Sequence, residues 1–360
     1  MKIALLASAS SIHTARWANG LNALGHEVHV ITQQPVSEAF TPNVKVHVFP
    51  NHGSLGYFTM AAAVRKLVRH LKPDILNAHY ASGYGTTARL VDFHPYLLSV
   101  WGSDVYDFPY ISPLHNYLLK KNLYAADAIA STSYCMAEQT KSLANHLPVI
   151  HITPFGVDLD KFKPINITKP FNNEAIVIGT VKTLSEKYGI KYLLRAFKIV
   201  SKKHSNLPLK LLIVGGGNLE RKLKQLAVEL EIAENTLFTG KVHHEEIPSY
   251  QNMLDVSVSV SVSNSESFGV AIIEASACAK PVVVSNVGGL PEVVEDGITG
   301  IIVPPANPEA TADAIEKLIL DPRLREQMGQ AGRQRVERLY AWNNNVQHMV
   351  GVYESLLRKP

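Results

Sequence analysis

The sequence predicts an α/β protein built from two doubly wound parallel-sheet domains, and three observations support this fold class. Short apolar runs, typical of buried strands, alternate with amphipathic helical segments along almost the whole chain. The alternation stops at residues 155–174, a linker-like segment rich in Pro, Asn and Lys, and then restarts. The length of 360 residues exceeds what a single hydrophobic core usually covers, which favours two domains.

The first domain is predicted to contain the strands that precede the break. The initial run at 2–7 imitates a signal peptide, but its apolar core is shorter than that of a usual signal sequence, so we interpret it as a strand. The following runs are mostly apolar and are bounded by polar turns, as buried parallel strands are. They lie at 26–32, 44–49, 74–79, 95–100, 127–132 and 148–153.

The second domain is predicted to repeat this pattern. Residues 255–262 alternate between Val and Ser, as a half-exposed strand would, but their place among helices favours a central strand. Helices are predicted at 189–204 and 220–230, and three more helical patterns end the chain. The other predicted strands are 175–181, 209–217, 235–240 and 281–285, and the final helical patterns are 307–320, 323–340 and 343–360.

We therefore expect an N-terminal domain of residues 1–163, to which the C-terminal helix 343–360 returns, and a C-terminal domain of residues 164–342. Hydrophobic residues make up 46% and charged residues 18% of the chain, which is typical of a globular protein. The net charge of +4 is mild, and the chain has no basic run of the kind that binds nucleic acid. No nucleic-acid partner is expected.

A membrane-spanning segment is not expected, because no apolar run approaches the roughly 20 residues that a span needs. The basic helix predicted at 60–72 either contacts anionic lipid peripherally or presents a solvated face. Its basic residues are Arg65, Lys66, Arg69 and Lys72. The two cysteines lie far apart and suggest no disulfide framework, which favours a cytoplasmic location, on the inner face of the membrane if the helix binds lipid.

Polar or glycine-rich loops follow six of the predicted strands. In open parallel α/β sheets, ligands bind at the carboxyl ends of the strands, so these loops should lie along the binding edge of each domain. Two such domains facing each other would form a cleft, which is a preferred place for a ligand. The loops are 8–13, 79–85, 101–104, 182–189, 215–217 and 263–269.

The second domain holds the clearest anion-binding pattern. Phe268, Gly269 and Val270 are predicted to open a helix, whose free N–H groups and positive dipole end suit a diphosphate. Glu266 precedes this helix start and Glu274 follows it by two turns, at a separation of about 12 Å along a helix axis. This separation exceeds the roughly 5 Å of a retaining glycosidase pair and suits a ligand held at both ends. A helix cap at Glu266 and a lysine pair at Glu274 remain the alternatives.

Two lysines, Lys182 and Lys187, lie in the loop after the first strand of that domain. Their positive side chains could neutralise charge on a departing diphosphate, although a loop lysine is more often simply solvated. The histidines have no carboxylate or cysteine at convincing metal-ligand spacing, and the acidic letters DLD at 158–160 belong to the linker. We therefore expect no metal site.

Residues 265–305, SESFGVAIIEASACAKPVVVSNVGGLPEVVEDGITGIIVPP, resemble the signature of the retaining glycosyltransferases of family 4, which have the GT-B fold of two Rossmann-like domains facing across a cleft. The E-x7-E pattern of that family corresponds to Glu266 and Glu274, and GGLPE follows at 288–292. The SIHTARW stretch at 11–17 resembles one branch of the family. Further similar segments lie at 152–164, 179–194, 211–217 and 238–242.

The resemblance implies a hexosyltransferase that moves a sugar from a nucleotide diphosphate donor, with a UDP-sugar as the expected donor. It also implies retention of configuration, no metal or other cofactor, and a saccharide or glycolipid acceptor of bacterial polysaccharide or glycolipid synthesis. By correspondence, Glu266 lies beside the hydroxyls of the donor sugar and Glu274 binds the ribose. The backbone of Phe268, Gly269 and Val270 corresponds to the contacts with sugar and phosphate.

The same resemblance assigns the remaining donor-side residues. Lys182 and Lys187 correspond to the basic pair on the diphosphate, although many members have arginine in the first place. Lysine keeps the charge but gives up bidentate geometry. Gly215 and Val242, in two of the similar segments, are expected to contact the donor.

The first domain supplies the expected acceptor side. Ser10 and Ser11 stand where many members carry a glycine pair, and His13 follows them. Trp101 stands where many relatives have a histidine, and it either stacks on a sugar or packs in the core. Asp104 is the polar candidate of the same loop, with helix capping as its alternative.

Other functions remain open. A nucleotide-sugar epimerase or hydrolase of the same fold would need no separate acceptor, and a non-catalytic sugar-binding protein would bind a donor without turnover. A dinucleotide oxidoreductase, suggested by the glycines at 215–217, is disfavoured because Glu220 replaces the third glycine of the G-x-G-x-x-G pattern.

Overall fold

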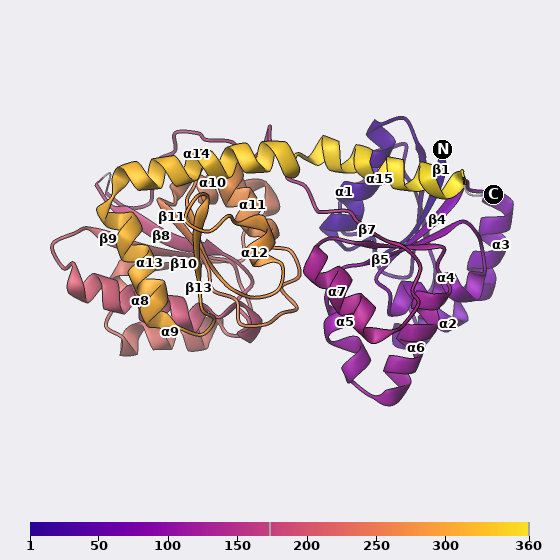
Figure 1. The fold of residues 1–360 in the computed structure, drawn as a ribbon, viewed down its shortest axis with the longest axis horizontal. Coiled ribbons are helices and arrows are strands. Elements are labelled where there is room, and N and C mark those ends of the chain that lie inside the picture. The colour runs from indigo at the N-terminus through magenta and orange to yellow at the C-terminus, as the bar shows by residue number, and fades with distance from the viewer. Residues whose placement is uncertain (173, 359–360) are drawn as a thin grey trace. The chain divides into compact units, whose positions relative to one another are not determined.

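The computed structural model describes residues 1–172 and 174–358 and confirms the predicted fold class of two parallel-sheet α/β domains. The chain divides into two compact units, Met1–Pro154 with Asn343–Pro360, and Phe155–Trp342 (Figure 1). By this division, residues 155–163 of the linker-like segment pack with the second unit, although we had expected them in the first domain. The predictions for residue 173 and residues 359–360 lie outside the described residues.

The sheet of the first unit has the strand order β3-β2-β1-β4-β5-β6-β7, and its strand pairs are parallel. From β1 the chain builds outward through β2 and β3, and it then returns to the other side of β1 to add β4. The boundary between β1 and β4 is therefore the switch point, where sheets of this kind bind ligands. The strands are β1 (Lys2–Leu6), β2 (Glu27–Thr32), β3 (Lys45–Val48), β4 (Ile75–His79), β5 (Tyr96–Val100), β6 (Ala128–Ser131) and β7 (Ile150–Ile152).

Helices cover both faces of this sheet. Leu76 and Ala78 of β4 belong to a buried cluster that also contains residues of α3, α4 and α6. Because side chains alternate along a strand, Asn77 points to the opposite face. The helices of this unit are α1 (Ile12–Ala23), α2 (Gly56–Thr59), α3 (Ala61–Leu71), α4 (Gly83–Val91), α5 (Ser103–Tyr106), α6 (Pro113–Tyr124), α7 (Tyr134–Leu143) and α15 (Trp342–Leu357).

The C-terminal helix α15 belongs to the first unit (Figure 1), and it buries apolar residues there, among them Val346, Met349 and Leu356, as well as making polar contacts. The amide of Asn77 donates to the buried Tyr353 hydroxyl at 2.8 Å and accepts from the Ser99 hydroxyl at 2.9 Å. At the beginning of the helix, Asn345 donates to the Pro154 carbonyl oxygen at 3.3 Å. A side-chain network inside the sheet thus sets the position of the helix.

The sheet of the second unit has the order β10-β9-β8-β11-β12-β13 and is also parallel, with its switch point between β8 and β11. The predicted central position of the Val-Ser strand is confirmed, because β11 lies between β8 and β12. The edge strand β13 was not among the predicted strands. The strands are β8 (Ile176–Val181), β9 (Leu209–Val214), β10 (Thr236–Gly240), β11 (Val256–Ser259), β12 (Val282–Ser285) and β13 (Gly300–Val303).

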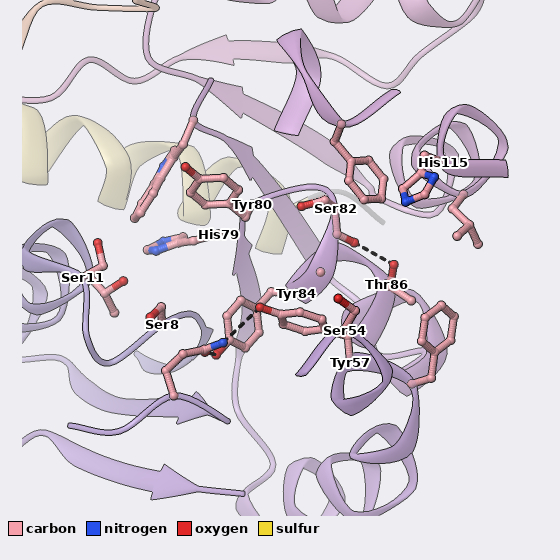
Figure 2. Close-up of a pocket in the computed structure, with 17 residues that line it drawn as sticks. Ser8, Ser11, Ser54, Tyr57, His79, Tyr80, Ser82, Tyr84, Thr86 and His115 are labelled. Atoms are coloured by element: carbon pink, nitrogen blue, oxygen red, sulfur yellow. Dashed lines mark hydrogen bonds between the residues drawn. The ribbon is translucent and has the colours of Figure 1, made fainter. Parts of the chain in front are cut away.

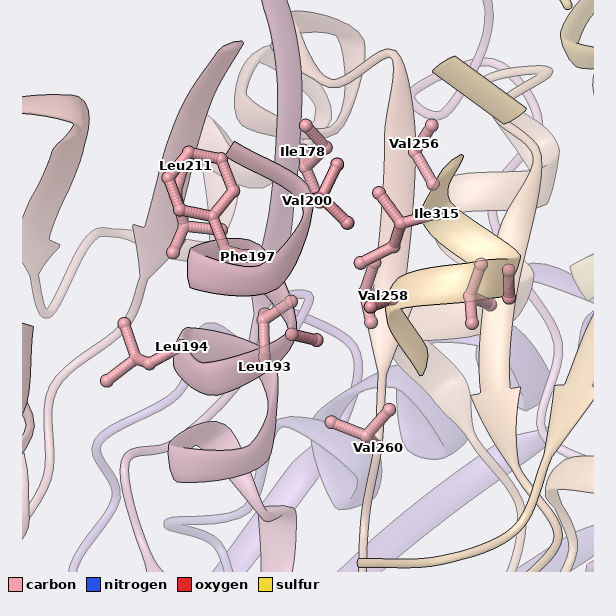
Figure 3. Packing of buried hydrophobic residues seen from close by; sticks show 14 of the residues in the cluster. Ile178, Leu193, Leu194, Phe197, Val200, Leu211, Val256, Val258, Val260 and Ile315 are labelled. Atoms are coloured by element: carbon pink, nitrogen blue, oxygen red, sulfur yellow. The ribbon is translucent and has the colours of Figure 1, made fainter. Parts of the chain in front are cut away.

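The main core of the second unit forms where α8 packs on this sheet (Figure 3). Leu193, Leu194, Phe197 and Val200 are spaced as one face of a helix and are fully buried, with Ile315 of α13 in the same cluster. The helices are α8 (Ile190–Lys203), α9 (Glu220–Glu229), α10 (Ile247–Met253), α11 (Val270–Ala277), α12 (Leu290–Val293), α13 (Pro308–Leu320) and α14 (Pro322–Leu339). Among the described residues, no helix combines the length and apolar character needed to cross a bilayer.

Replacing Tyr353 with Phe should destabilise the first unit by about 1–3 kcal/mol, because the buried Asn77 amide loses a hydrogen-bond partner. Chemical denaturation followed by circular dichroism would measure the change. Tyr117→Phe, at an exposed position of α6, is the matched control and should unfold like the wild type. Equal unfolding midpoints for Tyr353→Phe and the control would contradict this role of the Asn77–Tyr353 bond.

Candidate functional site

An ion pair marks the switch point of the second sheet. Lys182 follows β8 and Glu266 lies in the loop after β11, the strand next to β8. The Lys182 Nζ lies 2.8 Å from Glu266 Oε1, and the two side chains are only 10% and 8% exposed. Lys187 approaches the other carboxylate oxygen at 3.9 Å and donates to the Ser265 carbonyl oxygen at 2.7 Å. The structure thus brings together three of the residues predicted for the donor site.

The electrostatics of this cluster keep Lys182 charged. Burial by itself lowers the pKa of Lys182, but the neighbouring Glu266 charge and its hydrogen bond outweigh burial and raise the pKa above its ordinary value. The ring of Tyr188, which sequence reasoning did not single out, lies 4.8 Å from the Lys182 Nζ and 5.4 Å from the Lys187 Nζ. An aromatic face close to two ammonium groups stabilises their charge in place.

Glycines hold the loop of Lys182 in position. The turn at 215–217 packs directly on the backbone of residues 182–184, and a Cβ at Gly215 or Gly217 would clash with a carbonyl oxygen there. Backbone hydrogen bonds join the same segments, from Lys182 N to Val214 O at 2.9 Å and from Leu184 N to Gly216 O at 3.0 Å. Gly215 therefore packs directly against the backbone of Lys182 and holds this loop in position.

A second pair of glycines holds the loop of Glu266. A Cβ at Gly288 would clash with the Glu266 carbonyl oxygen, and a Cβ at Gly289 would clash with that of Ser267. The Gly289 N–H donates to the Glu266 carbonyl oxygen at 2.9 Å. Glycine is needed at 288 and 289 because this loop lies directly against the backbone of the Glu266 loop, which leaves no room for a side chain.

The helix after Glu266 begins later than the sequence suggested. Helix α11 starts at Val270 with Gly269 as its N-cap at φ +100°, so Phe268 does not open the helix. The Phe268 ring is buried against Phe155 and Tyr340, which leaves the backbone as the part of this residue that can meet a ligand. The expected start was wrong because the αL conformation of Gly269 interrupts the helical path.

Glu274 therefore lies about one turn into α11 rather than two, and it is buried. The separation of about 12 Å that we derived for a continuous helix does not apply, because Glu266 lies in the preceding loop. Val242 lies beyond β10, and its side chain packs against the smaller apolar cluster of this unit. Gly215 is bridged to Gly240, the last residue of β10, by a backbone hydrogen bond of 3.1 Å.

The first unit contains a cavity of about 450 Å³ at its own switch point (Figure 2). Much of its polar lining comes from the segments after β1 and β4, with Gln34 from the loop after β2, Trp101 from the loop after β5 and aromatic residues from nearby helices. The lining residues are Ser8, Ser11, Thr14, Gln34, Ser54, Tyr57, Phe58, His79, Tyr80, Ser82, Gly83, Tyr84, Thr86, Trp101, Phe108, His115 and Leu118.

Trp101 stands among aromatic rings at one side of this cavity. Its ring centroid lies 4.4 Å from that of His79 with a tilt of 38°, and it meets His13 and Tyr80 edge-on at 5.9 Å. Burial, and to a lesser extent the charge of His13, lowers the pKa of His79 to about 3. The His79 imidazole is therefore neutral at physiological pH.

The other predicted acceptor-side residues have different surroundings. Ser11 lines the cavity as the N-cap of α1, whereas Ser10 is exposed and its hydroxyl bonds that of Ser8 at 2.9 Å. Asp104 is buried, and its carboxylate accepts backbone N–H bonds from Ala81 at 2.8 Å and Gly102 at 2.8 Å. Burial raises the Asp104 pKa, against the opposing effect of these bonds. Asp104 thus joins two loops of the cavity wall.

Sequence reasoning found the strand-end loops of this cavity but missed its helical wall. Tyr57 and Phe58 come from α2, and His115 comes from α6, far from any strand end. Their helices carry no motif, so only the folded chain could place them here. Among residues 1–172 and 174–358, no group of three or more His, Cys, Asp or Glu side chains could hold a metal ion.

Two family models match the chain, one in each unit. The model described as glycosyl transferase 4-like matches residues 2–133, and the model described as glycosyl transferases group 1 matches residues 163–335.

Two relatives extend this similarity over most of the chain. An uncharacterised glycosyltransferase of Methanocaldococcus jannaschii is 26% identical, in an alignment that covers 96% of this chain and 93% of the relative. A D-inositol 3-phosphate glycosyltransferase of Pseudarthrobacter chlorophenolicus is 28% identical, in an alignment that covers 92% of this chain and 86% of the relative.

Solved structures share the fold. Sucrose-phosphate synthase from Thermosynechococcus elongatus has a TM-score of 0.84 at 21% identity, with 99% of each chain covered. Anabaena HepE in complex with UDP-glucose has a TM-score of 0.78 at 19% identity, with 99% of this chain and 100% of HepE covered. Each unit thus resembles a glycosyltransferase family model, and the solved structures share the two-domain GT-B fold.

Proposed function

We propose that this protein transfers a sugar from a UDP-sugar to a saccharide or glycolipid acceptor, with retention of anomeric configuration and without a metal ion. The observation that carries the proposal is the buried Lys182–Glu266 pair at the switch point of the second sheet, just before the start of α11. Ammonium groups held in place, such as those of Lys182 and Lys187, can stabilise the charge on a leaving diphosphate. The HepE complex with UDP-glucose supports uridine as the nucleotide base.

On donor binding, the lysines and the glutamates take separate roles. Lys182 and Lys187 bind the diphosphate, and Glu266 accepts hydrogen bonds from hydroxyls of the donor sugar. Glu274 on α11 binds the ribose. The backbone N–H groups of Gly269 and Val270, together with the Phe268 backbone, contact sugar and phosphate, since a helix start favours an anion. Among the described residues these groups lie within one unit.

The proposed step is a front-face displacement at the anomeric carbon. The acceptor hydroxyl forms the new C–O bond on the face from which the bond to the phosphate oxygen breaks. The proton of the acceptor hydroxyl passes to the departing phosphate oxygen, so no separate protein base is needed. Lys182 and Lys187 neutralise the negative charge that develops on the diphosphate, which lowers the barrier.

The cavity of the first unit is the proposed acceptor site. It contains Ser11 and Trp101 of the expected acceptor-side residues and has the size of a small-molecule pocket. His13 contacts the Trp101 ring from the first helix. Asp104 contributes by holding the backbones of two loops rather than by contacting the acceptor. Ser10 is exposed in the segment that leads into α1.

The proposal includes a cytoplasmic location with peripheral contact at the inner face of the membrane. Three basic residues of the α3 region, Lys66, Arg69 and Lys72, are exposed and suited to anionic lipid. Arg65 is directed elsewhere, because its guanidinium donates to the Val91 carbonyl oxygen at 3.1 Å and to that of Leu90. Cys135 and Cys278 form no disulfide, which suits a reducing compartment.

Glu266→Ala should nearly abolish transfer, by at least the roughly 10²–10³-fold typical of a lost contact to the reacting group. The assay incubates UDP-glucose with a saccharide panel and measures UDP release and the anomeric proton of the product by NMR. The control is Glu186→Ala, which removes an exposed glutamate between the two lysines and should transfer normally.

The same assay separates the competing functions. Retained configuration and acceptor-dependent UDP release are expected for the wild type. Free or epimerised sugar from donor alone would favour a hydrolase or epimerase, and donor binding without turnover would favour a sugar-binding protein. Wild-type turnover by Glu266→Ala would overturn the assigned role.

Lys187→Ala should lower kcat by about 10²–10³-fold, because a positive charge beside the departing diphosphate is lost. Lys187 is 31% exposed on its side chain, so the variant should still fold. The control is Lys191→Ala, which breaks an exposed ion pair with Glu186 on the adjacent helix. Thermal unfolding of both variants would verify folding, and equal kcat values for the two would argue against the diphosphate role.

Lys66→Glu combined with Arg69→Glu should weaken binding to vesicles of anionic lipid by more than tenfold, since each basic residue near such a surface contributes about 1 kcal/mol. Vesicle co-sedimentation at low and high salt would measure this. The control with the same change in charge is Arg221→Glu combined with Lys222→Glu, two exposed residues of α9. An equal loss in both double variants would refute a specific contact at α3.

A further inference from the structure

The cavity of the first unit has a lining without formal charge. Among the described residues, the 17 that line it include no Asp, Glu, Lys or Arg. His79, one of its two histidines, is held neutral because burial lowers its pKa to about 3. A phosphate or carboxylate entering this cavity would lose its water without gaining a cation, and burying an unpaired charge is costly.

The lining instead combines aromatic faces with hydroxyl groups (Figure 2). Trp101, Tyr80 and Tyr57 offer flat apolar surfaces, while Ser11 and Ser82 offer hydroxyls that donate and accept hydrogen bonds. A sugar ring has the matching pattern, with apolar C–H faces and hydroxyls at its edge. Pockets that are mostly apolar with a few placed polar groups are typical of specific small-ligand sites.

Two polar atoms in the wall lack partners within the protein. Among the described residues, the buried His79 Nδ1 and Thr14 Oγ1 have no hydrogen-bond partner, and both residues line the cavity. An unsatisfied buried polar atom costs free energy that a partner of either polarity would recover. Both groups are neutral, so they add no cation to the cavity wall.

We propose that this cavity binds an uncharged saccharide ring of the acceptor, free of phosphate and carboxylate groups. The inference rests on the proposed function and adds the chemical class of the acceptor. The chain therefore differs in its substrate from a transferase that acts on a phosphorylated ring. Selectivity comes from the missing cation as much as from the contacts made, because a charged competitor loses its hydration without compensation.

The test compares matched probes that differ by one phosphate, methyl α-D-glucopyranoside with its 6-phosphate and myo-inositol with myo-inositol 3-phosphate. Binding to the full chain is measured by saturation-transfer NMR, together with a panel of neutral methyl glycosides. We expect binding of neutral members, at least tenfold tighter than that of their phosphorylated counterparts. Equal or tighter binding of the phosphates, or no binding by any neutral member, would overturn the proposal.

A variant with an added cation provides a second test. It is expected to gain binding of the phosphorylated probes, and a misfolded variant would not gain binding. Ser54 is exposed and lines the cavity, so Ser54→Lys places an ammonium group at its edge. The variant should bind the phosphorylated probes at least tenfold more tightly than the wild type does, and an unchanged preference would count against the inference. UDP-glucose binding is measured on the same samples. If UDP-glucose does not bind, the proposed function fails. If UDP-glucose binds but the phosphorylated probes bind as tightly as the neutral ones, this inference alone fails.

Discussion

The buried ion pair between Lys182 and Glu266 is the constraint on which the second unit's site depends. Each charge is removed from water, so either one alone would be strongly unfavourable, and the pair persists because the two loops are held at a fixed separation. Close backbone contacts at the glycines of 215–217 hold the Lys182 loop, and those at 288–289 hold the Glu266 loop. Charged groups held in place before a ligand arrives suit the electrostatic stabilisation that we propose.

The candidate sites of the two units lie at the same place in their sheets but have different chemical linings. In each sheet the candidate site lies where the strand order reverses, between β8 and β11 in one and between β1 and β4 in the other. The first of these sites concentrates ammonium and carboxylate groups, whereas the second is lined by aromatic rings and hydroxyls. This division suits a reaction in which one substrate carries a diphosphate and the other is neutral.

The helix start at Val270 links the fold to the proposed chemistry. The positive φ of Gly269 ends the loop of Glu266 and turns the chain into α11, which begins at Val270. The buried Phe268 ring fixes this turn against Phe155 and Tyr340. The positive φ of Gly269 and the packing of Phe268 thus determine where the helix start lies.

The sequence by itself determined the two-domain parallel-sheet fold and singled out Glu266, Lys182 and Lys187, which the structure brings together, because strand periodicity and an ordered motif are local properties of the chain. It did not determine the start of α11, the edge strand β13 or the burial of Asp104, since a helix start, an edge and a buried carboxylate depend on what packs against them. Only the tertiary structure decided that Tyr57, Phe58 and His115 join Trp101 and His79 around one cavity. These residues come from separate elements with no common motif, and long-range packing alone brings them together.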